Sequence, residues 1–119
     1  MKTDVSFIIS IDSSFEMTNN FFEHLLQDEF ALNSEIIVVL DAITNCYTIK
    51  YIKQLSKYDN IKIYTLDQKA GYGKANNYAV KQAQNNILYF INTDVFAEKD
   101  CFEKMLDALM GENVACVQP

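Results

Sequence analysis

The chain of 119 residues lacks arginine and tryptophan, and it holds only three glycines and one proline. Disordered and collagen-like chains are richer in glycine or proline and poorer in apolar residues, whereas half of this chain is apolar, so both classes are excluded. Sixteen acidic residues against ten lysines give a formal net charge of −6. Because a nucleic-acid-binding face must offer basic side chains to phosphates, we expect no nucleic-acid partner.

Cysteine and histidine are scarce as well. Three cysteines stand at wide spacings without a CxxC pair, and His24 is the only histidine. A disulfide framework needs paired cysteines and a structural zinc site needs clustered ligands, so neither is expected. The composition favours reduced thiols in a cytoplasmic protein.

Long apolar runs are also missing. No stretch approaches the roughly 18 apolar residues that a membrane-spanning helix requires. The first twelve residues, MKTDVSFIISID, lack the apolar length and the cleavage site of a secretory signal. We therefore expect no transmembrane segment in this part of the protein and a cytoplasmic location, with the inner face of the membrane as a further place of attachment.

Short apolar runs rich in β-branched residues alternate with segments of helical periodicity. Strands are predicted at residues 5–11, 35–40, 60–66, 87–91 and 114–117. Between them, apolar residues recur every three or four positions, and Ser13 with Glu16 has the spacing of a capping box at the start of the first helix. Residues 87–91 form the most continuously apolar run and are expected in the centre of the sheet, whereas the half-polar run 60–66 fits an edge.

This alternation predicts the fold class. Strands that alternate with helices form parallel sheets joined by right-handed crossovers. We expect one Rossmann-like α/β domain over residues 1–119, with a mostly parallel, doubly wound sheet of about five strands and helices on both faces.

Polar residues gather where the predicted strands end. In open α/β sheets, ligands bind beyond the carboxyl ends of the strands, at the point where the strand order reverses. The residues at those ends are Ser10, Asp12 and Ser13, then Asp41, then Gly71 and Lys74, and finally Asn92 and Asp94. Carboxylate and amide oxygens suit Mg²⁺ or Mn²⁺, so we predict a divalent metal there that binds a diphosphate. The competing interpretation is that these residues only form turns and helix caps.

The segment Gly71-Tyr72-Gly73 has part of the pattern of a dinucleotide-binding loop. That fingerprint needs a third glycine where Asn76 stands, and it belongs after the first strand of its unit. The segment therefore predicts a flexible loop leading into a helix, whose free N–H groups can meet a phosphate.

Four short motifs follow one another over nearly the whole chain: VSFIIS at 5–10, EIIVVLD at 35–41, KAGYGKANNYA at 69–79 and FINTD at 90–94. They resemble, in order, V-S-I-I-I-P, E-I-I-V-V-D-D, N-x-G-x-x-x-A-x-N-x-G and the N-x-D form of a D-x-D-type motif. Those motifs are typical of inverting family 2 glycosyltransferases with the GT-A fold. The chain thus resembles the N-terminal nucleotide-binding part of such an enzyme.

The resemblance implies a donor-binding domain. The full-length protein would transfer a sugar, with inversion, from UDP or dTDP to a glycan or a lipid-linked acceptor. Asp41 would accept the N3–H of uracil or thymine, Asp94 would hold the divalent cation, and Asn92 would face the ribose or the metal. The remaining donor-binding residues implied are Ser10 in the base pocket, with Asp12, Gly71, Lys74 and Asn77.

In the resembled family the catalytic base lies in the second half of the domain, beyond residue 119 here. We therefore expect these residues to be the donor-binding part alone, without a catalytic residue and unable to transfer sugar. We also expect exposed apolar surface that favours a homo-oligomer. The abundance of isoleucine, asparagine and lysine without arginine suggests an AT-rich bacterial genome and polysaccharide synthesis.

Departures from the family pattern leave two other interpretations open. Leu40 replaces the first acid of the D-D pair, Asn92 is neutral, and Asp12 stands where the family has Tyr. A catalytically inactive nucleotide-binding module therefore remains an alternative. A receiver-like signalling domain is a second one, with Asp67 as phosphate acceptor, but it lacks the lysine expected after the fifth strand.

Overall fold

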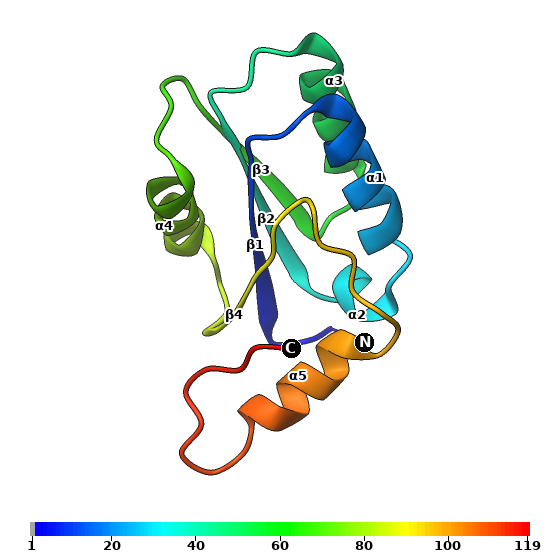
Figure 1. Ribbon diagram of the computed structural model, residues 1–119, viewed down its shortest axis with the longest axis vertical. Coiled ribbons are helices and arrows are strands. Elements are labelled where there is room, and N and C mark those ends of the chain that lie inside the picture. Colours follow the sequence, from blue (N-terminus) through cyan, green and yellow to red (C-terminus); the bar gives the residue numbers. More distant parts are fainter. Residues whose placement is uncertain (1) are drawn as a thin grey trace.

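The computed structural model describes residues 2–119 as one layered α/β domain (Figure 1). Its elements are β1 (Val5–Ile11), α1 (Phe15–Leu25), α2 (Glu29–Leu32), β2 (Glu35–Asp41), α3 (Cys46–Gln54), the 3-10 helix η1 (Leu55–Lys57), β3 (Ile61–Leu66), α4 (Tyr72–Gln82), β4 (Ile87–Phe90) and α5 (Cys101–Leu109). No helix within residues 2–119 is both long enough and apolar enough to cross a membrane.

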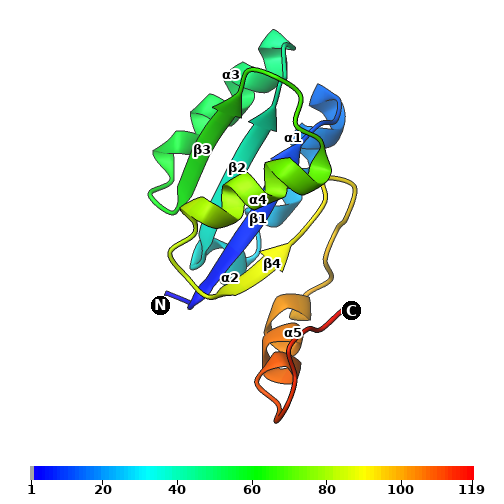
Figure 2. The same ribbon diagram turned by 90° about the vertical axis from the view of Figure 1, so that its left-hand side faces the viewer.

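The sheet is parallel and has the order β3-β2-β1-β4. The helices α1 and α3 cover one face and α4 covers the other, as the two views show (Figures 1 and 2). The chain therefore winds outward from β1 through β2 to β3, and then crosses back over the opposite face to β4. This confirms the predicted doubly wound α/β class with helices on both faces.

The predicted number and placement of strands needs two corrections. Among residues 2–119 the sheet has four strands rather than five, because residues 114–117 lie in an irregular tail after α5 that pairs with no strand. The second correction concerns β4, which is an edge strand rather than a central one. The strand is apolar although it lies at an edge, because Tyr89 packs into the core. Phe90, on the opposite face, is 53% exposed.

Two apolar layers hold the domain together. On the face of α1 and α3, alternate residues of β1 and β2 pack with Phe21, Phe22 and Ile52. On the other face, Ala75 and Ala79 bring α4 close to the sheet at Ile8, Ile37 and Val39. Small side chains allow this close approach, which sets the position of the loop that precedes α4.

An aromatic cluster fixes α5 against the same layer as α1. The rings of Phe7 and Phe102 meet edge to face with centroids 4.9 Å apart, and Tyr89 donates its hydroxyl to the carbonyl of Phe102 at 2.9 Å. Burial, with the nearby charge of Glu103, raises the pKa of Tyr89 to about 12, so this phenol remains a donor at neutral pH. The cluster determines where the chain runs after β4.

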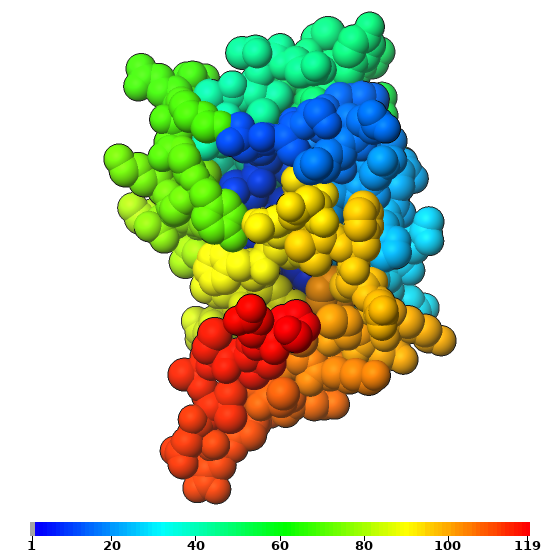
Figure 3. Space-filling view, viewed as in Figure 1, coloured from blue at the N-terminus to red at the C-terminus, as the bar shows by residue number. Residues whose placement is uncertain are grey.

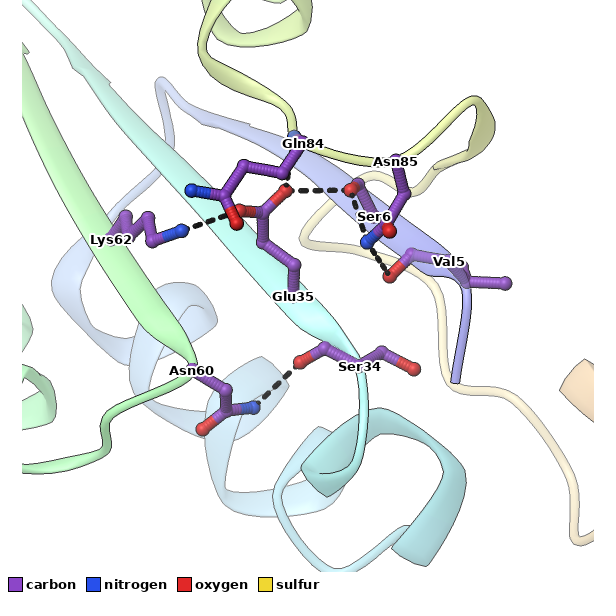
Figure 4. A network of polar contacts seen from close by, with 8 residues as sticks. All are labelled: Val5, Ser6, Ser34, Glu35, Asn60, Lys62, Gln84 and Asn85. Carbon is purple, nitrogen blue, oxygen red and sulfur yellow. Dashed lines mark hydrogen bonds and ion pairs between the residues drawn. The ribbon is translucent and has the colours of Figure 1, made fainter. Parts of the chain in front are cut away.

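The amino ends of the strands carry a polar network (Figure 4). The Glu35 carboxylate forms an ion pair with Lys62 and accepts the Ser6 hydroxyl at 2.6 Å and the backbone N–H of Gln84 at 2.8 Å. Asn85 also donates to the Ser6 hydroxyl at 3.1 Å. Three neighbouring strands and the α4–β4 connection are thus joined at the end of the sheet opposite the predicted site.

The first helix begins one residue later than its sequence pattern predicts. Ser14, not Ser13, is the N-cap of α1, and its hydroxyl accepts the backbone N–H of Met17 at 3.2 Å. The Ser13 side chain turns instead toward other hydroxyl groups at the carboxyl end of the sheet.

Candidate donor-binding site

The strand order reverses between β1 and β4, and the polar residues at their carboxyl ends lie on either side of this point. The helices α1 and α3, which follow β1 and β2, cover one face, whereas α4, which connects β3 to β4, covers the other, so the order of the strands reverses between β1 and β4. In doubly wound sheets this is where ligands bind. In the space-filling view, the blue end of β1 is visible between the green segment around α4 and the yellow segment after β4 (Figure 3).

The two predicted residues on β1 differ in exposure. Ser10 is half-buried in the last part of the strand, beside Val39 of β2. Asp12 is exposed just after the strand and forms an ion pair with Lys69, in the loop that leads to α4. The ion pair connects the end of β1 with the β3–α4 loop.

Asp41 is the most buried of the predicted site residues, with 2% of its surface exposed. Its Oδ1 accepts the backbone N–H of Ala70 at 2.7 Å, and its Oδ2 accepts that of Gly71 at 2.9 Å. A carboxylate offers about four lone pairs, so these two hydrogen bonds leave two of them unused. Asp41 therefore holds the β3–α4 loop over the end of β2, a role that its strand-end position did not predict.

The start of α4 follows directly from this loop. Gly71 is its N-cap with φ of 87°, a conformation that residues with a side chain rarely adopt, and no side chain caps the helix there. Lys74 and Asn77 are both exposed on α4. Their neighbour Asn76 is 5% exposed and its Oδ1 has no hydrogen-bond partner. The start of α4 thus has backbone N–H groups that no side chain caps, and Lys74 is exposed in its first turn.

The Asn92-Thr93-Asp94 segment forms a turn directly after β4. Its first and last side chains are exposed, and the backbone N–H of Val95 bonds to the carbonyl of Asn92 at 3.2 Å. Thr93 points inward, is 7% exposed, and lies with its Oγ1 2.9 Å from the Ser13 Oγ. The turn therefore contacts the loop after β1 through the inward side chain of Thr93, while Asn92 and Asp94 face solvent.

The donor atoms for a cation are few. No group of three or more His, Cys, Asp or Glu side chains within residues 2–119 could hold a metal ion. A carboxylate from Asp94 and an amide oxygen from Asn92 nevertheless fit Mg²⁺ or Mn²⁺, which usually take one or two carboxylates and fill the remaining positions with phosphates and water. The donor set is compatible with a cation that arrives together with a diphosphate.

Contacts that sequence reasoning missed connect some of the predicted residues. Within residues 2–119, no side-chain hydrogen bond or ion pair joins Ser10, Lys74 or Asn77 to the others. Asp12 reaches the β3–α4 loop through Lys69, Asp41 closes the same loop, and Ser13 reaches Thr93. His24 of α1 adds a hydrogen bond of 3.1 Å from its Nε2 to the carbonyl of Ala97, in the segment after the turn. Ser13 is among the strand-end residues that the sequence predicts, whereas the only signal for Thr93 is its place between Asn92 and Asp94.

Comparisons with known proteins identify the family and the fold of the chain. The family model described as glycosyl transferase family 2 matches residues 6–119. The fold is that of a doubly wound parallel α/β domain, and because the family model matches nearly the whole chain, the chain belongs to glycosyl transferase family 2. This confirms the resemblance, and the strand order differs from the 2-1-3-4-5 order of receiver domains, so the receiver interpretation is wrong.

Solved structures share the fold at low sequence identity. The mannosyltransferase PcManGT from Pyrobaculum calidifontis, in complex with GDP-Man and Mn²⁺, matches with a TM-score of 0.82 and 15% identity over 100% of this chain and 36% of its own. S. aureus TarS 1-349, in complex with UDP-GlcNAc, matches with a TM-score of 0.76 and 23% identity over 92% of this chain and 31% of its own. The chain thus spans about a third of each of these structures. No curated protein matches its sequence.

Proposed function

We propose that this chain binds the nucleoside diphosphate part of a sugar donor at the carboxyl ends of β1, β2 and β4. The observation that carries the proposal is the placement of Asp41, Asp12 and the 92–94 turn around the strand-order reversal of a glycosyl transferase family 2 domain. As a domain of 1–119 it would supply the donor side. The whole protein would transfer the sugar, with inversion, to a glycan or a lipid-linked acceptor.

Each side chain has a role in this proposal. Asp41 accepts the N3–H of uracil or thymine with the lone pairs that the loop leaves free, and Ser10 and Asp12 line the base pocket. Lys74 and the N–H groups at the start of α4 attract the diphosphate, because a helix N-terminus favours anions. Asn77 lies on the same helix, further along. UDP and dTDP therefore fit better than CDP, whose N3 carries no proton.

Asp94 and Asn92 would hold a divalent cation, Mn²⁺ or Mg²⁺. When bound, that ion neutralises charge on the diphosphate, which the exposed carboxylates of Asp12 and Asp94 would otherwise repel. Mn²⁺ accompanies GDP-Man in the structure of the mannosyltransferase with the same fold, which supports a cation as partner. In this chain Lys69 lies against Asp12 and reduces the same repulsion.

A calorimetric titration tests the proposal. UDP, dTDP and GDP are titrated into the chain in Mn²⁺ and in EDTA, and the tightest binding is expected for UDP or dTDP with Mn²⁺. Asp94→Ala is expected to abolish the Mn²⁺-dependent part, and Asp107→Ala, an exposed change on α5, to leave it intact. Equal UDP affinity in EDTA and Mn²⁺ would disprove the metal role, and no binding of any nucleotide would disprove the function.

An inactive nucleotide-binding module is the second candidate, favoured by one observation. Leu40, at the position of the first acid of the family's D-D pair, is 2% exposed and packs in the core beneath α1 and α3. The position serves packing here rather than ligand binding. Sugar turnover by the full-length protein would exclude this candidate, whereas metal-dependent nucleotide binding without turnover would support it.

A further inference from the structure

Three hydroxyl groups connect the start of α1 with the turn after β4. The Ser13 Oγ lies 3.0 Å from the Thr18 Oγ1 and 2.9 Å from the Thr93 Oγ1. Thr18 is fully buried on α1, and Thr93 is 7% exposed. Ser13 lies in the loop after β1, five residues before Thr18, so the chain of hydroxyls joins the β1–α1 region to a turn 80 residues further along the sequence.

Ser13 is the middle hydroxyl of the three and forms hydrogen bonds with both threonines. A hydroxyl has one donor and two acceptor lone pairs, so Ser13 can donate to one threonine while it accepts from the other. Thr18 is held by a helix whose Phe21 and Phe22 are buried in the core. The rigid end of the chain is therefore α1, and the part that it restrains is the turn at Thr93.

Thr93 stands between the two residues that the proposed function places at the cation. Its inward side chain leaves the side chains of Asn92 and Asp94 on the exposed side of the same turn. The direction of both side chains depends on the backbone of this turn, which bonds within itself through Val95 N–H and the carbonyl of Asn92. A shift of Thr93 would therefore move both candidate metal ligands together.

We propose that Ser13, supported by Thr18, is a positioning residue that fixes the 92–94 turn so that Asp94 and Asn92 present their oxygens to one divalent cation. The inference rests on the proposed function and deepens it. Groups that orient metal ligands through hydrogen bonds usually matter at a level of roughly 10–100-fold in metal affinity. The link needs no contact between Ser13 and the nucleotide.

The test combines a ligand-free and a ligand-bound measurement. Hydrogen exchange of the amides of residues 92–95 is followed by NMR in the chain without ligand, and UDP binding is measured in Mn²⁺ and in EDTA. Ser13→Ala and Thr93→Val are expected to speed exchange in the turn and to weaken Mn²⁺-dependent binding about ten-fold or more. UDP affinity in EDTA is expected to stay the same, because base and ribose contacts are unchanged.

Two control variants separate positioning from a general loss of structure. Thr93→Ser keeps the hydroxyl and is expected to behave like the unchanged chain. Ser56→Ala removes an exposed hydroxyl in η1, away from the turn, and is expected to change neither exchange at 92–95 nor Mn²⁺-dependent binding. Normal Mn²⁺-dependent binding in Ser13→Ala, or unaltered exchange at 92–95, would overturn this inference alone. Absence of Mn²⁺-dependent UDP binding by the unchanged chain would overturn the proposed function and this inference with it.

Discussion

Gly71 donates its backbone N–H to the Oδ2 of Asp41 across 2.9 Å. The neighbouring Ala70 N–H occupies the other carboxylate oxygen at 2.7 Å. The residue proposed to read the base is therefore also the one that closes the loop before α4. Any change at Asp41 affects both the loop and the proposed base contact. Base selectivity therefore has to be measured as the ratio of the affinities for two nucleotides rather than as one affinity.

Asp41→Asn is expected to weaken both the loop and the base contact. The amide keeps one acceptor oxygen, and its NH₂ group faces a backbone donor, which costs about 1–3 kcal/mol of unfolding free energy. UDP affinity is expected to fall roughly ten-fold or more, as for a lost charge-assisted hydrogen bond. Urea unfolding and calorimetry with UDP and CDP measure the two effects.

Asp67→Asn provides a control, since Asp67 is exposed in the same loop. It is expected to change neither stability nor the preference for UDP over CDP. If Asp41→Asn loses stability but keeps that preference, Asp41 supports the loop and does not read the base.

Gly71 and Gly73 form a matched pair for the start of α4. Gly71 has φ of 87°, whereas a methyl group at Gly73 would meet nothing within 4 Å and stands inside the helix. Gly71→Ala is expected to lower the unfolding free energy by about 1–3 kcal/mol, because the combination of φ 87° and ψ 166° is adopted almost only by glycine. Gly73→Ala is expected to raise it by about 0.5–1 kcal/mol, since glycine is a poor helix former. Equal effects of the two changes in urea titrations would show that backbone conformation does not determine the change in unfolding free energy at these positions.

The fold was predictable because its pattern is local. The runs at β1 and β2 are almost wholly buried, and β-branched residues in short apolar runs indicate such strands directly. The place of β4 was not predictable in this way. An apolar strand can lie in the centre of a sheet, or at an edge with one face uncovered. Only the path of α4 over β1 and β2 places β4 at the edge.

The site was predictable in outline and not in its connections. Strand ends are visible in the sequence, which is why Asp41 and Asp94 could be placed at the carboxyl edge of the sheet. Hydrogen bonds between distant segments leave no local pattern, so the contact of Ser13 with Thr93, 80 residues apart, was not predictable. The same holds for Asn76, whose burial depends on how α4 turns toward the sheet.

The pKa of Glu35 determines how the stability of the domain is expected to depend on pH. Burial alone would raise its pKa, but hydrogen bonds from Lys62, Ser6 and the Gln84 N–H together outweigh burial and lower the pKa below its usual 4.5. A group with a lowered pKa in the folded state stabilises fully above its unfolded value. Its contribution is lost as the pH falls from about 4.5 through the lower pKa of the folded chain.

Glu35→Gln removes this contribution. The variant is expected to lose about 1–3 kcal/mol at pH 7, as for hydrogen bonds to a charged group, and to be less sensitive to acid than the unchanged chain. Urea unfolding at pH 7 and at a series of values below 4.5 measures both effects. Glu112→Gln, at an exposed carboxyl in the C-terminal tail, is expected to change neither. Parallel pH profiles for Glu35→Gln and the unchanged chain would contradict the role of this network.

The edge at β4 leads to the last prediction. Among residues 2–119, β4 pairs only with β1, so its outer backbone groups face no strand. Phe90 on this strand is 53% exposed, and Val95 and Phe96 just beyond it are 45% and 53% exposed. Open edges beside apolar side chains favour association with another chain.

We therefore expect the isolated chain to self-associate through this edge, in line with the homo-oligomer expected from exposed apolar surface on the donor-binding part. Phe90→Lys puts a charge on the edge and is expected to keep the chain monomeric in sedimentation at concentrations where the unchanged chain associates, because charged side chains on an edge strand oppose pairing. Tyr47→Lys is the control, since Tyr47 is 67% exposed but lies on α3, beside Phe15 and away from β4. If both variants sediment like the unchanged chain, association does not use the β4 edge; if Tyr47→Lys alone yields monomers, the contact is on the α3 side.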